Sequence, residues 1–334
     1  MFDITAVGEL LIDFTPAGVS DAGDPLFAQK PGGAPANVLA ANSRLGGHNA
    51  FIGKVGNDGF GDFLRGTLEK LRIDVSGLCT DPEIPTTLAF VQLDRNGDRS
   101  FSFYRKPGAD LMLRSSEIND SLISGCRILH FGSVSMTGEP SRSATLSAVR
   151  AARKLGRIIS YDPNYRPPLW ENAGTAKEQM TAGLELADII KVSEEEMALL
   201  TGESNLEKGS AALARFGASL VFISLGAGGA FYRSGDLCGA LPAYGVKTID
   251  TNGAGDAFLG AALFRLRGKT LEEIRSLKEA ELKDILLFAN AAGALTTVKN
   301  GAIPAMPSLE EIRSCMETVP FLPRGCASSI CRSY

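Results

Sequence analysis

The sequence has few of the residues that most metal and disulfide sites need. It contains two histidines, His48 and His130, and neither belongs to an HExxH motif or to a recognisable Ser–His arrangement. The six cysteines are scattered and form no CxxC pair, which argues against both a zinc site and a disulfide framework. We therefore expect reduced thiols and a cytoplasmic protein.

Long apolar runs and an excess of positive charge are also missing. Nowhere do about 18 apolar residues follow one another, so neither a membrane span nor an export signal is expected. The formal net charge is -4, and this argues against a nucleic-acid partner, because clustered Lys and Arg hold phosphate backbones. Glycine, in contrast, is abundant, at 37 of 334 residues. This abundance favours an α/β protein with many tight turns between strands and helices.

Strand and helix patterns alternate along most of the chain. Short buried-strand patterns near residues 4–7, 50–55, 128–131 and 189–192 alternate with helical patterns. This rhythm predicts an α/β fold with a doubly wound and mostly parallel sheet flanked by helices, with ligands at the carboxyl ends of the strands.

Residues 86–104 depart from this rhythm. Apolar residues alternate on both sides of Asn96-Gly97, which predicts a β-hairpin. We expect this hairpin to form a small β-sheet lid, built from segments 10–32 and 86–108, on a single domain that spans residues 1–319. The hairpin is also suited to dimerisation, and both roles are open. Residues 320–334 lose their apolar periodicity and are expected to form a disordered or non-native tail.

The stretch Asp250–Phe258 (DTNGAGDAF) carries the strongest chemical signal. Gly253 and Gly255 have no side chain to keep a phosphate away from the backbone, and the start of a helix offers unpaired N–H groups to an anion. Asp256 stands where a general base accepts a proton from a substrate hydroxyl. The stretch therefore indicates phosphoryl transfer. The alternative is an aspartate that only supports the first helical turn, worth ~0.3 to 1 kcal/mol.

Other nucleotide motifs fail on spacing. Gly268-Lys269-Thr270 ends like a P-loop, but Leu263 occupies the position of the first glycine. The glycines between residues 53 and 61 do not match GxGxxG, so a dinucleotide site is a weak reading.

Polar residues follow several of the predicted strands. Asp13, Gly33, Asn37, Asp162 and Arg166 are candidates for sugar hydroxyls or phosphate at this edge of the sheet. The run from Ser193 to Glu196 reads as a helix cap that is also compatible with Mg²⁺ bound through water, and the glycine turn after Ser224 allows a nucleotide near the backbone.

These motifs, in this order, resemble the PfkB or ribokinase-like family of sugar and nucleoside kinases over residues 3–310. The resemblance implies Asp256 as the catalytic base and ATP with Mg²⁺ as the phosphoryl donor. It also implies an anion hole made by Gly253, Ala254, Gly255 and Asp256.

Within that family, the runs GELLIDFTP, GAPAN, FYRKPGAD and YDPNYRPPLW look most like those of fructokinases, which phosphorylate the 6-hydroxyl of fructose. The implied sugar contacts are Asp13, Gly33, Asn37, Phe103, Arg105, Asp162 and Arg166. The implied nucleotide contacts are Lys191, Ser193, Ser224, Gly226, Gly228 and Asn290.

Two positions depart from the family pattern, and cations are implied beside them. Ser193 replaces an Asn of an Asn-x-x-Glu motif, whereas Glu196 keeps the acidic position and is the expected water-mediated Mg²⁺ contact. Asn252 replaces a common Thr and is expected to act mainly through its backbone. The family often binds a monovalent cation, and Asp250, Asn252 and Gly301 are the K⁺ contacts that this implies.

The leading hypothesis is therefore ATP-dependent phosphorylation of D-fructose to fructose 6-phosphate. A 2-keto-3-deoxygluconate kinase or another PfkB sugar kinase is the nearest alternative, because it shares a similar Asp-Pro-Asn-x-Arg-Pro run. From another class, a catalytically silent sugar- or nucleotide-binding regulator is the competing hypothesis, and a dinucleotide-dependent oxidoreductase is the weakest.

Overall fold

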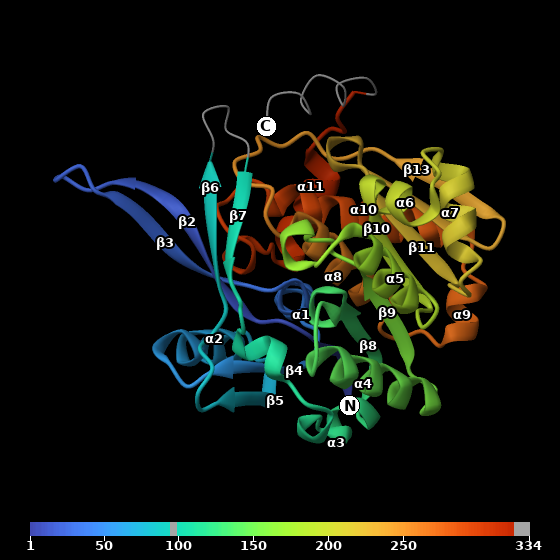
Figure 1. Ribbon diagram of the computed structural model, residues 1–334. Coiled ribbons are helices and arrows are strands. Elements are labelled where there is room, and N and C mark those ends of the chain that lie inside the picture. Colours follow the sequence, from blue (N-terminus) through green and yellow to red (C-terminus); the bar gives the residue numbers. More distant parts are fainter. Residues whose placement is uncertain (94–98, 324–334) are drawn as a thin grey trace.

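The computed structural model describes residues 1–93 and 99–323 of the chain, and its body is built on one large twisted sheet (Figure 1). In this part of the chain the sheet has nine strands in the order β13-β12-β11-β10-β9-β8-β1-β4-β5. Along this order, each strand from β11 to β5 is parallel to the next. Strands β12 and β13 are antiparallel to their neighbours. The strands are β1 (Phe2–Val7), β4 (Asn49–Gly56), β5 (Asp74–Asp81), β8 (Cys126–Gly132), β9 (Ile158–Asp162), β10 (Ile189–Ser193), β11 (Leu220–Ser224), β12 (Ala230–Ser234) and β13 (Leu237–Leu241).

Helices cover both faces of this sheet, because its strands are apolar on both sides. Phe51 and Ile52 are consecutive in β4 and fully buried, yet they belong to separate hydrophobic clusters on opposite faces. The cluster on one face includes residues of α1 (Ala34–Arg44), α2 (Gly59–Lys70), α8 (Ala254–Leu266), α9 (Leu271–Arg275) and α10 (Glu279–Thr296). The cluster on the other includes residues of α3 (Asp120–Ser124), α4 (Ser141–Lys154), α5 (Ala173–Leu184), α6 (Glu194–Thr201) and α7 (Leu206–Ala214). The predicted doubly wound α/β fold is confirmed.

The order of the strands reverses at β1. The chain leaves β1 toward β4 and β5 on one side, and later returns to place β8 to β11 on the other side. Loops that follow β1 and β8 therefore diverge, and they leave a crevice at the carboxyl ends of the strands. The site described below lies at this edge.

A second, small sheet stands to one side of the body, at the left of Figure 1. Its order is β3-β2-β6-β7, with β2 (Leu11–Val19), β3 (Pro25–Gly32), β6 (Leu88–Leu93) and β7 (Arg99–Tyr104). The β2–β3 and β6–β7 pairs are antiparallel and β2–β6 is parallel. These strands lie in the two predicted lid segments and confirm the hairpin, whereas its predicted Asn96-Gly97 turn lies outside the described residues.

The first residues of the predicted tail, 320–322, contact the folded body. After α11 (Leu309–Thr318), Gly245 donates its N–H to the carbonyl of Pro320 at 2.8 Å, and Leu322 donates to Ala243 at 2.9 Å. The rings of Tyr244 and Phe321 lie 4.8 Å apart. Residues 320–322 are thus held by the fold, and the rest of the predicted tail, from residue 324, lies outside the described residues.

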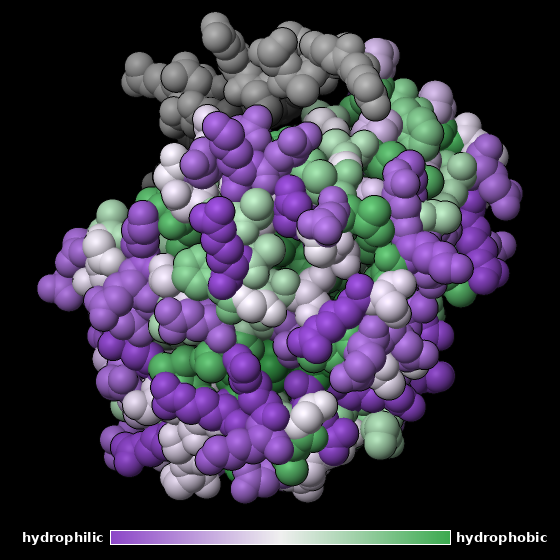
Figure 2. Space-filling view, turned by 90° about the vertical axis from the view of Figure 1, so that its right-hand side faces the viewer, coloured by the Kyte–Doolittle hydropathy of each residue, from purple (hydrophilic) through white to green (hydrophobic). Residues whose placement is uncertain are grey.

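The surface agrees with the composition. Hydrophilic residues dominate the face shown in Figure 2, with apolar residues in patches between them. Across residues 1–93 and 99–323, no helix combines the length and the apolar character that a membrane crossing requires.

The close packing of α1 on α8 is expected to depend on Gly260. A β-carbon at this position would lie 2.5 Å from the carbonyl oxygen of Val38, so the two helices would have to separate. We expect Gly260→Ala to lower the free energy of unfolding by about 1–3 kcal/mol. Gly66→Ala in α2 is the matched control, because a β-carbon there meets nothing within 4 Å. It should raise stability by about 0.5–1 kcal/mol. Chemical denaturation measures both, and shifts of the same sign would contradict this account.

Candidate active site

The turn before α8 is fixed by Asp250 and by close contact with the loop around residue 301. Asp250 accepts hydrogen bonds from the backbone N–H groups of Asn252 and Gly301, both at 2.8 Å. Gly253 precedes the helix with φ of 75°, and a β-carbon there would lie 2.5 Å from the β-carbon of Ala302. Only glycine fits this backbone and this space. This turn leads into α8, whose first N–H groups have no carbonyl partner within the helix; that of Ala254 donates to the carbonyl of Thr251 at 3.3 Å.

Asp256, in the first turn of α8, is held by two asparagines from different parts of the chain. Asn37 of α1 donates its Nδ2 to Oδ2 of Asp256 at 2.8 Å, and Asn164, after β9, donates to Oδ1 at 3.3 Å. Burial raises the pKa of Asp256, while the Lys191 cation and the bond from Asn37 oppose that rise. The result is an oriented carboxylate with increased basicity, as a general base requires.

Five of the seven predicted sugar contacts line one cavity together with Asp256. These five are Asp13, Gly33, Asn37, Phe103 and Arg166. Asp13 and Phe103 come from the small sheet, so the lid and the body share this cavity. Burial raises the pKa of Asp13 to about 6, and a hydrogen bond from the side chain of Asn252 opposes that rise. Asn252 thus acts through its side chain as well, which corrects the expectation of a mainly backbone role.

Arg105 is placed differently from the prediction. Its Nε and Nη2 lie 2.8 and 2.7 Å from Oδ2 of Asp110. The guanidinium also donates to Oγ1 of Thr137 at 2.7 Å and to the carbonyl of Val134 at 3.1 Å. Arg105 is not among the described residues that line the cavity. Arg105 is paired with a buried carboxylate and ties the end of β7 to the body, and its contact with a sugar stays a prediction.

Asp162 and Lys191 form a buried ion pair beside the anion-binding turn. Nζ of Lys191 lies 2.8 Å from Oδ2 of Asp162, and both side chains are at most 8% exposed. Burial lowers the pKa of Lys191, but the carboxylates of Asp162 and Glu196 outweigh this and raise it, so the lysine stays charged. A β-carbon on Gly255 would lie 2.9 Å from Nζ, which places this cation against the first turn of α8. The predicted sugar contact Asp162 therefore holds Lys191, and it does not line the cavity within the described chain.

Ser193 and Glu196 cap α6 at the end of β10. Oγ of Ser193 accepts the N–H of Glu196 at 3.1 Å, and Oε2 of Glu196 accepts the N–H of Ser193 at 2.7 Å. Oε1 of Glu196 accepts the N–H of Tyr165 at 2.6 Å. These bonds fix the carboxylate at the same sheet edge as Lys191, and each oxygen keeps a lone pair for water.

The predicted nucleotide contacts Ser224, Gly226, Gly228 and Asn290 gather near the end of β11. The hydroxyl of Ser224 donates to the carbonyl of Val192 at 3.3 Å, and residues 226–228 form a short 3₁₀ turn. Asn290 of α10 donates its Nδ2 to the carbonyls of Leu241 and Pro242, at 3.2 and 3.0 Å. The amide nitrogen of Asn290 therefore holds the backbone segment that packs on Gly229. The atom of Asn290 left to contact a nucleotide is Oδ1.

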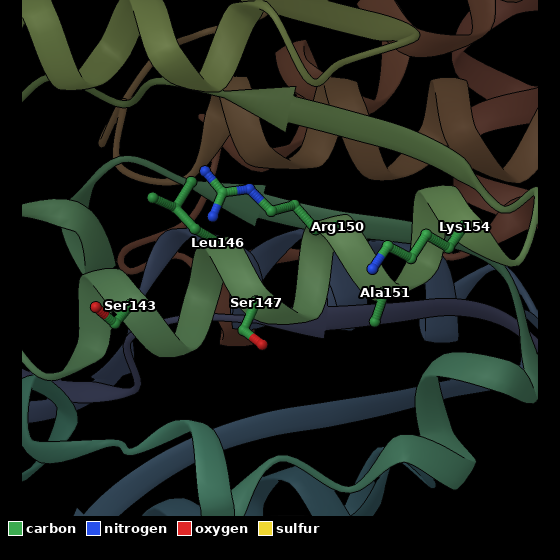
Figure 3. Close-up of a pocket in the computed structure, with 6 residues that line it drawn as sticks. All are labelled: Ser143, Leu146, Ser147, Arg150, Ala151 and Lys154. Carbon is green, nitrogen blue, oxygen red and sulfur yellow. The ribbon is translucent and has the colours of Figure 1, made fainter.

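A second depression lies on the outer surface of α4. Its six labelled side chains come from this one helix, and among them Arg150 and Lys154 are basic (Figure 3). None of the predicted site residues lines it. Its position on an outer helix, away from the carboxyl ends of the strands, separates it from the site around Asp256.

Two polar residues of the cavity were not predicted as contacts. Glu9 lies two residues after β1, and Asn164 lies two residues after β9, in the Asp-Pro-Asn run. The signal that could have found them is their place just beyond the ends of central strands, where ligands of open α/β sheets bind.

The described residues include no group of three or more His, Cys, Asp or Glu arranged to hold a metal ion. Mg²⁺ does not need such a group when phosphates supply other ligands, because it is commonly bound by one or two carboxylates and several waters. Glu196 is placed to serve in this way, as an acidic group at the sheet edge. The carboxylate of Asp250 accepts the N–H groups of Asn252 and Gly301, and Asn252 turns its side chain to Asp13.

Comparison with known proteins agrees with this geometry. The family described as pfkB family carbohydrate kinase matches residues 1–309. The chain is 43% identical over 319 residues to probable fructokinase-4 of Arabidopsis thaliana, covering 94% of this chain and 96% of that relative. Its fold is similar to fructokinase from Xylella fastidiosa with bound ATP, with a TM-score of 0.88, 34% identity and coverage of 95% and 99%. Fructokinase from Vibrio cholerae O395, in a form with fructose, ADP and calcium bound, gives a TM-score of 0.84, 37% identity and coverage of 94% and 98%.

The family match and the relatives span nearly the whole described chain. The chain belongs to the PfkB family of carbohydrate kinases.

Proposed function

We propose that this protein is an ATP-dependent fructokinase that converts D-fructose to fructose 6-phosphate. The observation that carries the proposal is Asp256, a carboxylate fixed by Asn37 and Asn164 in a cavity that the lid and the body share. Relatives named as fructokinases, and a fructokinase structure with fructose and ADP bound, support fructose as the acceptor.

In the proposed reaction, Asp256 accepts the proton of the fructose 6-hydroxyl as that oxygen attacks the γ-phosphorus of ATP. The bond between the γ-phosphorus and the β–γ bridging oxygen breaks, and ADP leaves. The first N–H groups of α8 and the Lys191 cation, which lies against Gly255, stabilise charge on the transferring phosphoryl group. Asp13 and Phe103 bring the lid over the sugar and exclude water.

Charge in the cavity favours a neutral sugar over a sugar acid such as 2-keto-3-deoxygluconate. The carboxyl residues that line the cavity are Glu9, Asp13 and Asp256. Arg166 is the cationic residue that lines it in the described structure, because Arg105 is already paired with Asp110. A carboxylate on the substrate would add negative charge to a site with one available guanidinium, which costs binding energy.

A substrate panel tests the proposal. Phosphorylation of fructose, 2-keto-3-deoxygluconate, ribose and adenosine by ATP would be measured with a coupled ADP assay, and the product position by ³¹P and ¹³C NMR. We expect the highest kcat/KM for fructose, with phosphate on carbon 6. A higher kcat/KM for the sugar acid would overturn the assignment. ADP release that does not depend on any sugar would favour the silent regulator instead.

We also propose Mg²⁺ at the nucleotide phosphates and K⁺ beside the turn before α8. Magnesium would neutralise phosphate charge, and Glu196 would hold it through water. The loop from residue 296 to 301, which Asp250 ties to this turn, supplies the place for K⁺. A double mutant of the Vibrio cholerae fructokinase, in a form with fructose, ADP and potassium ion bound, supports K⁺ as the ion. Repeating the fructose assay with Na⁺ in place of K⁺ tests it.

The lid is also proposed to form a homodimer. Its face opposite Asp13 carries stacked and edge-on aromatic rings, and two of them, Phe27 and Tyr104, are 44% and 66% exposed. Exposed aromatic side chains are typical of interfaces.

A cytoplasmic location fits the four described cysteines, which are all free thiols.

A further inference from the structure

Glu9 joins the end of β1 to the start of α1. It is 3% exposed, and its Oε1 accepts the backbone N–H of Ala34 at 2.9 Å. Gly33, which precedes the helix, has no side chain with which to cap it. One oxygen of Glu9, from the segment between β1 and β2, therefore caps α1.

The second carboxylate oxygen of Glu9, Oε2, is not used by this cap. Among the described residues, Oε2 of Glu9 has no hydrogen-bond partner although it is buried, and the same holds for Oδ1 of Asn37. Both residues line the cavity that contains Asp13 and Asp256. Buried polar atoms are almost always paired, and an orphan beside a cavity points to a partner supplied by the ligand.

Glu9 and Asp256 lie in different electrostatic surroundings of this cavity. Burial raises the pKa of Glu9 to about 7, and the charged neighbours that act on it are Asp110 and Arg105. Lys191 and Arg166 are the cations that act on Asp256. Since Asp256 takes the hydroxyl that is phosphorylated, Glu9 is left to meet another part of the sugar.

We propose that Glu9 is a further sugar-binding residue, whose Oε2 bonds one fructose hydroxyl other than the one that is phosphorylated. This inference rests on the proposed fructokinase activity and adds a specificity contact to it. A purely structural Glu9 would need only Oε1, because the cap on α1 uses that atom alone. The leftover oxygen and the leftover acceptor of Asn37 together form a polar wall that suits a ligand rich in hydroxyl groups.

Deoxy sugars test this contact directly. Fructose, 1-deoxyfructose, 3-deoxyfructose, 4-deoxyfructose and 2,5-anhydromannitol would be compared as substrates of the wild-type protein and of Glu9→Gln. The glutamine keeps a carbonyl for the N–H of Ala34 and replaces the second oxygen with an amide NH₂ group. We expect KM for fructose to rise about 10- to 100-fold with a smaller change in kcat, as for a lost hydrogen bond to a charged group. For one analogue, the kcat/KM should be lower than that of fructose with the wild-type protein but equal to it with Glu9→Gln. The other analogues should stay poorer than fructose by the same factor in both proteins.

Asp58→Asn is the matched control. Asp58 caps α2 through the N–H of Gly61 at 2.8 Å and does not line the cavity. This variant should have a lower free energy of unfolding. The ratios of kcat/KM between fructose and its analogues should stay the same as in the wild-type protein. The same pattern in Glu9→Gln would show that Glu9 is only a cap and would overturn the proposal.

A crystal structure of the wild-type protein with fructose and the non-hydrolysable ATP analogue AMP-PNP gives a second test that no variant can confound. We expect a sugar oxygen within about 3.2 Å of Oε2 of Glu9, the usual hydrogen-bond range. A sugar bound at Asp256 with no oxygen near Glu9 would overturn this inference and leave the fructokinase proposal standing. A wild-type protein that does not phosphorylate fructose would instead overturn the fructokinase proposal, and the inference with it.

Discussion

Asp256→Asn is expected to lower kcat for fructose by roughly 10²- to 10⁴-fold, the usual contribution of a general base. Asparagine keeps the size of the side chain and an oxygen for Asn37, but it cannot accept the proton of the attacking hydroxyl. Fructose binding, measured by calorimetry without ATP, should change little. Removing the charge should not weaken the folded protein, because burial raises the pKa of Asp256, so its ionisation costs folding free energy.

Asp188→Asn is the control for this change. Asp188 lies just before β10, at the amino ends of the strands and so opposite to the candidate active site. Its Oδ2 accepts the N–H of Ile159 at 2.8 Å. The same chemical substitution there should leave kcat unchanged. If Asp256→Asn also kept near-normal turnover, the carboxylate would not be the base, and the phosphoryl-transfer site would have to be assigned elsewhere.

The pH profile of the wild-type protein follows from the same carboxylate. The base must be ionised, so kcat/KM should fall as the pH drops through the pKa of Asp256 in the free protein. Burial raises this pKa above the ordinary value of 3.8, so the decline should begin at a higher pH than an exposed aspartate would give. The part of the decline that Asp256 causes should disappear in the residual activity of Asp256→Asn, whereas any part due to Glu9 and Asp13, whose pKa values burial raises to about 7 and about 6, should remain.

The sequence predicted the fold well in the interior and less well at the edges of the sheet. Central strands such as β1 and β10 are buried on both faces and give continuous apolar runs. The edge strands β5 and β13 were not predicted. They are only partly buried, so their apolar pattern is interrupted by exposed positions.

The site was predictable where position along a strand decides the function. Asp13 comes a few residues after the central strand β1, and Asn37 lies in the first turn of α1, so their places in the chain bring both to the cavity. For Arg105 and Asp162, position along the chain did not predict which buried group each one meets. Asp110 meets Arg105 through the conformation of the intervening loop, and Lys191 meets Asp162 through the pairing of β9 with β10. Side-chain pairing of this kind depends on tertiary structure.

Lys191→Met is expected to reduce both stability and catalysis. Removing the lysine leaves Asp162 buried without its cation, and breaking a buried ion pair in this way typically costs about 3–5 kcal/mol of unfolding free energy. It also removes a positive charge that lies against Gly255, at the turn proposed to bind the γ-phosphate. By analogy with the loss of one oxyanion donor, kcat should fall by about 10²- to 10³-fold.

A double variant separates the two effects. In Lys191→Met with Asp162→Asn, the buried carboxylate is also removed, so the unfolding free energy should exceed that of Lys191→Met alone. The positive charge is still absent, so kcat should remain low. Lys54→Met is the matched control, because Lys54 is a second buried lysine, 3.2 Å from Asp81 and 2.8 Å from Glu117, that does not line the cavity. It should destabilise the protein without lowering kcat of the folded fraction.

The pH profile then shows whether Lys191 acts on the catalytic base itself. The Lys191 cation opposes the rise that burial causes in the pKa of Asp256. Without it that pKa rises further, so the acidic decline of kcat/KM should move to higher pH in Lys191→Met and stay in place in Lys54→Met. Recovery of kcat together with stability in the double variant, with no shift of the decline in Lys191→Met, would contradict this account. Lys191 would then serve only to neutralise Asp162, and phosphate stabilisation would rest on the N–H groups of α8 alone.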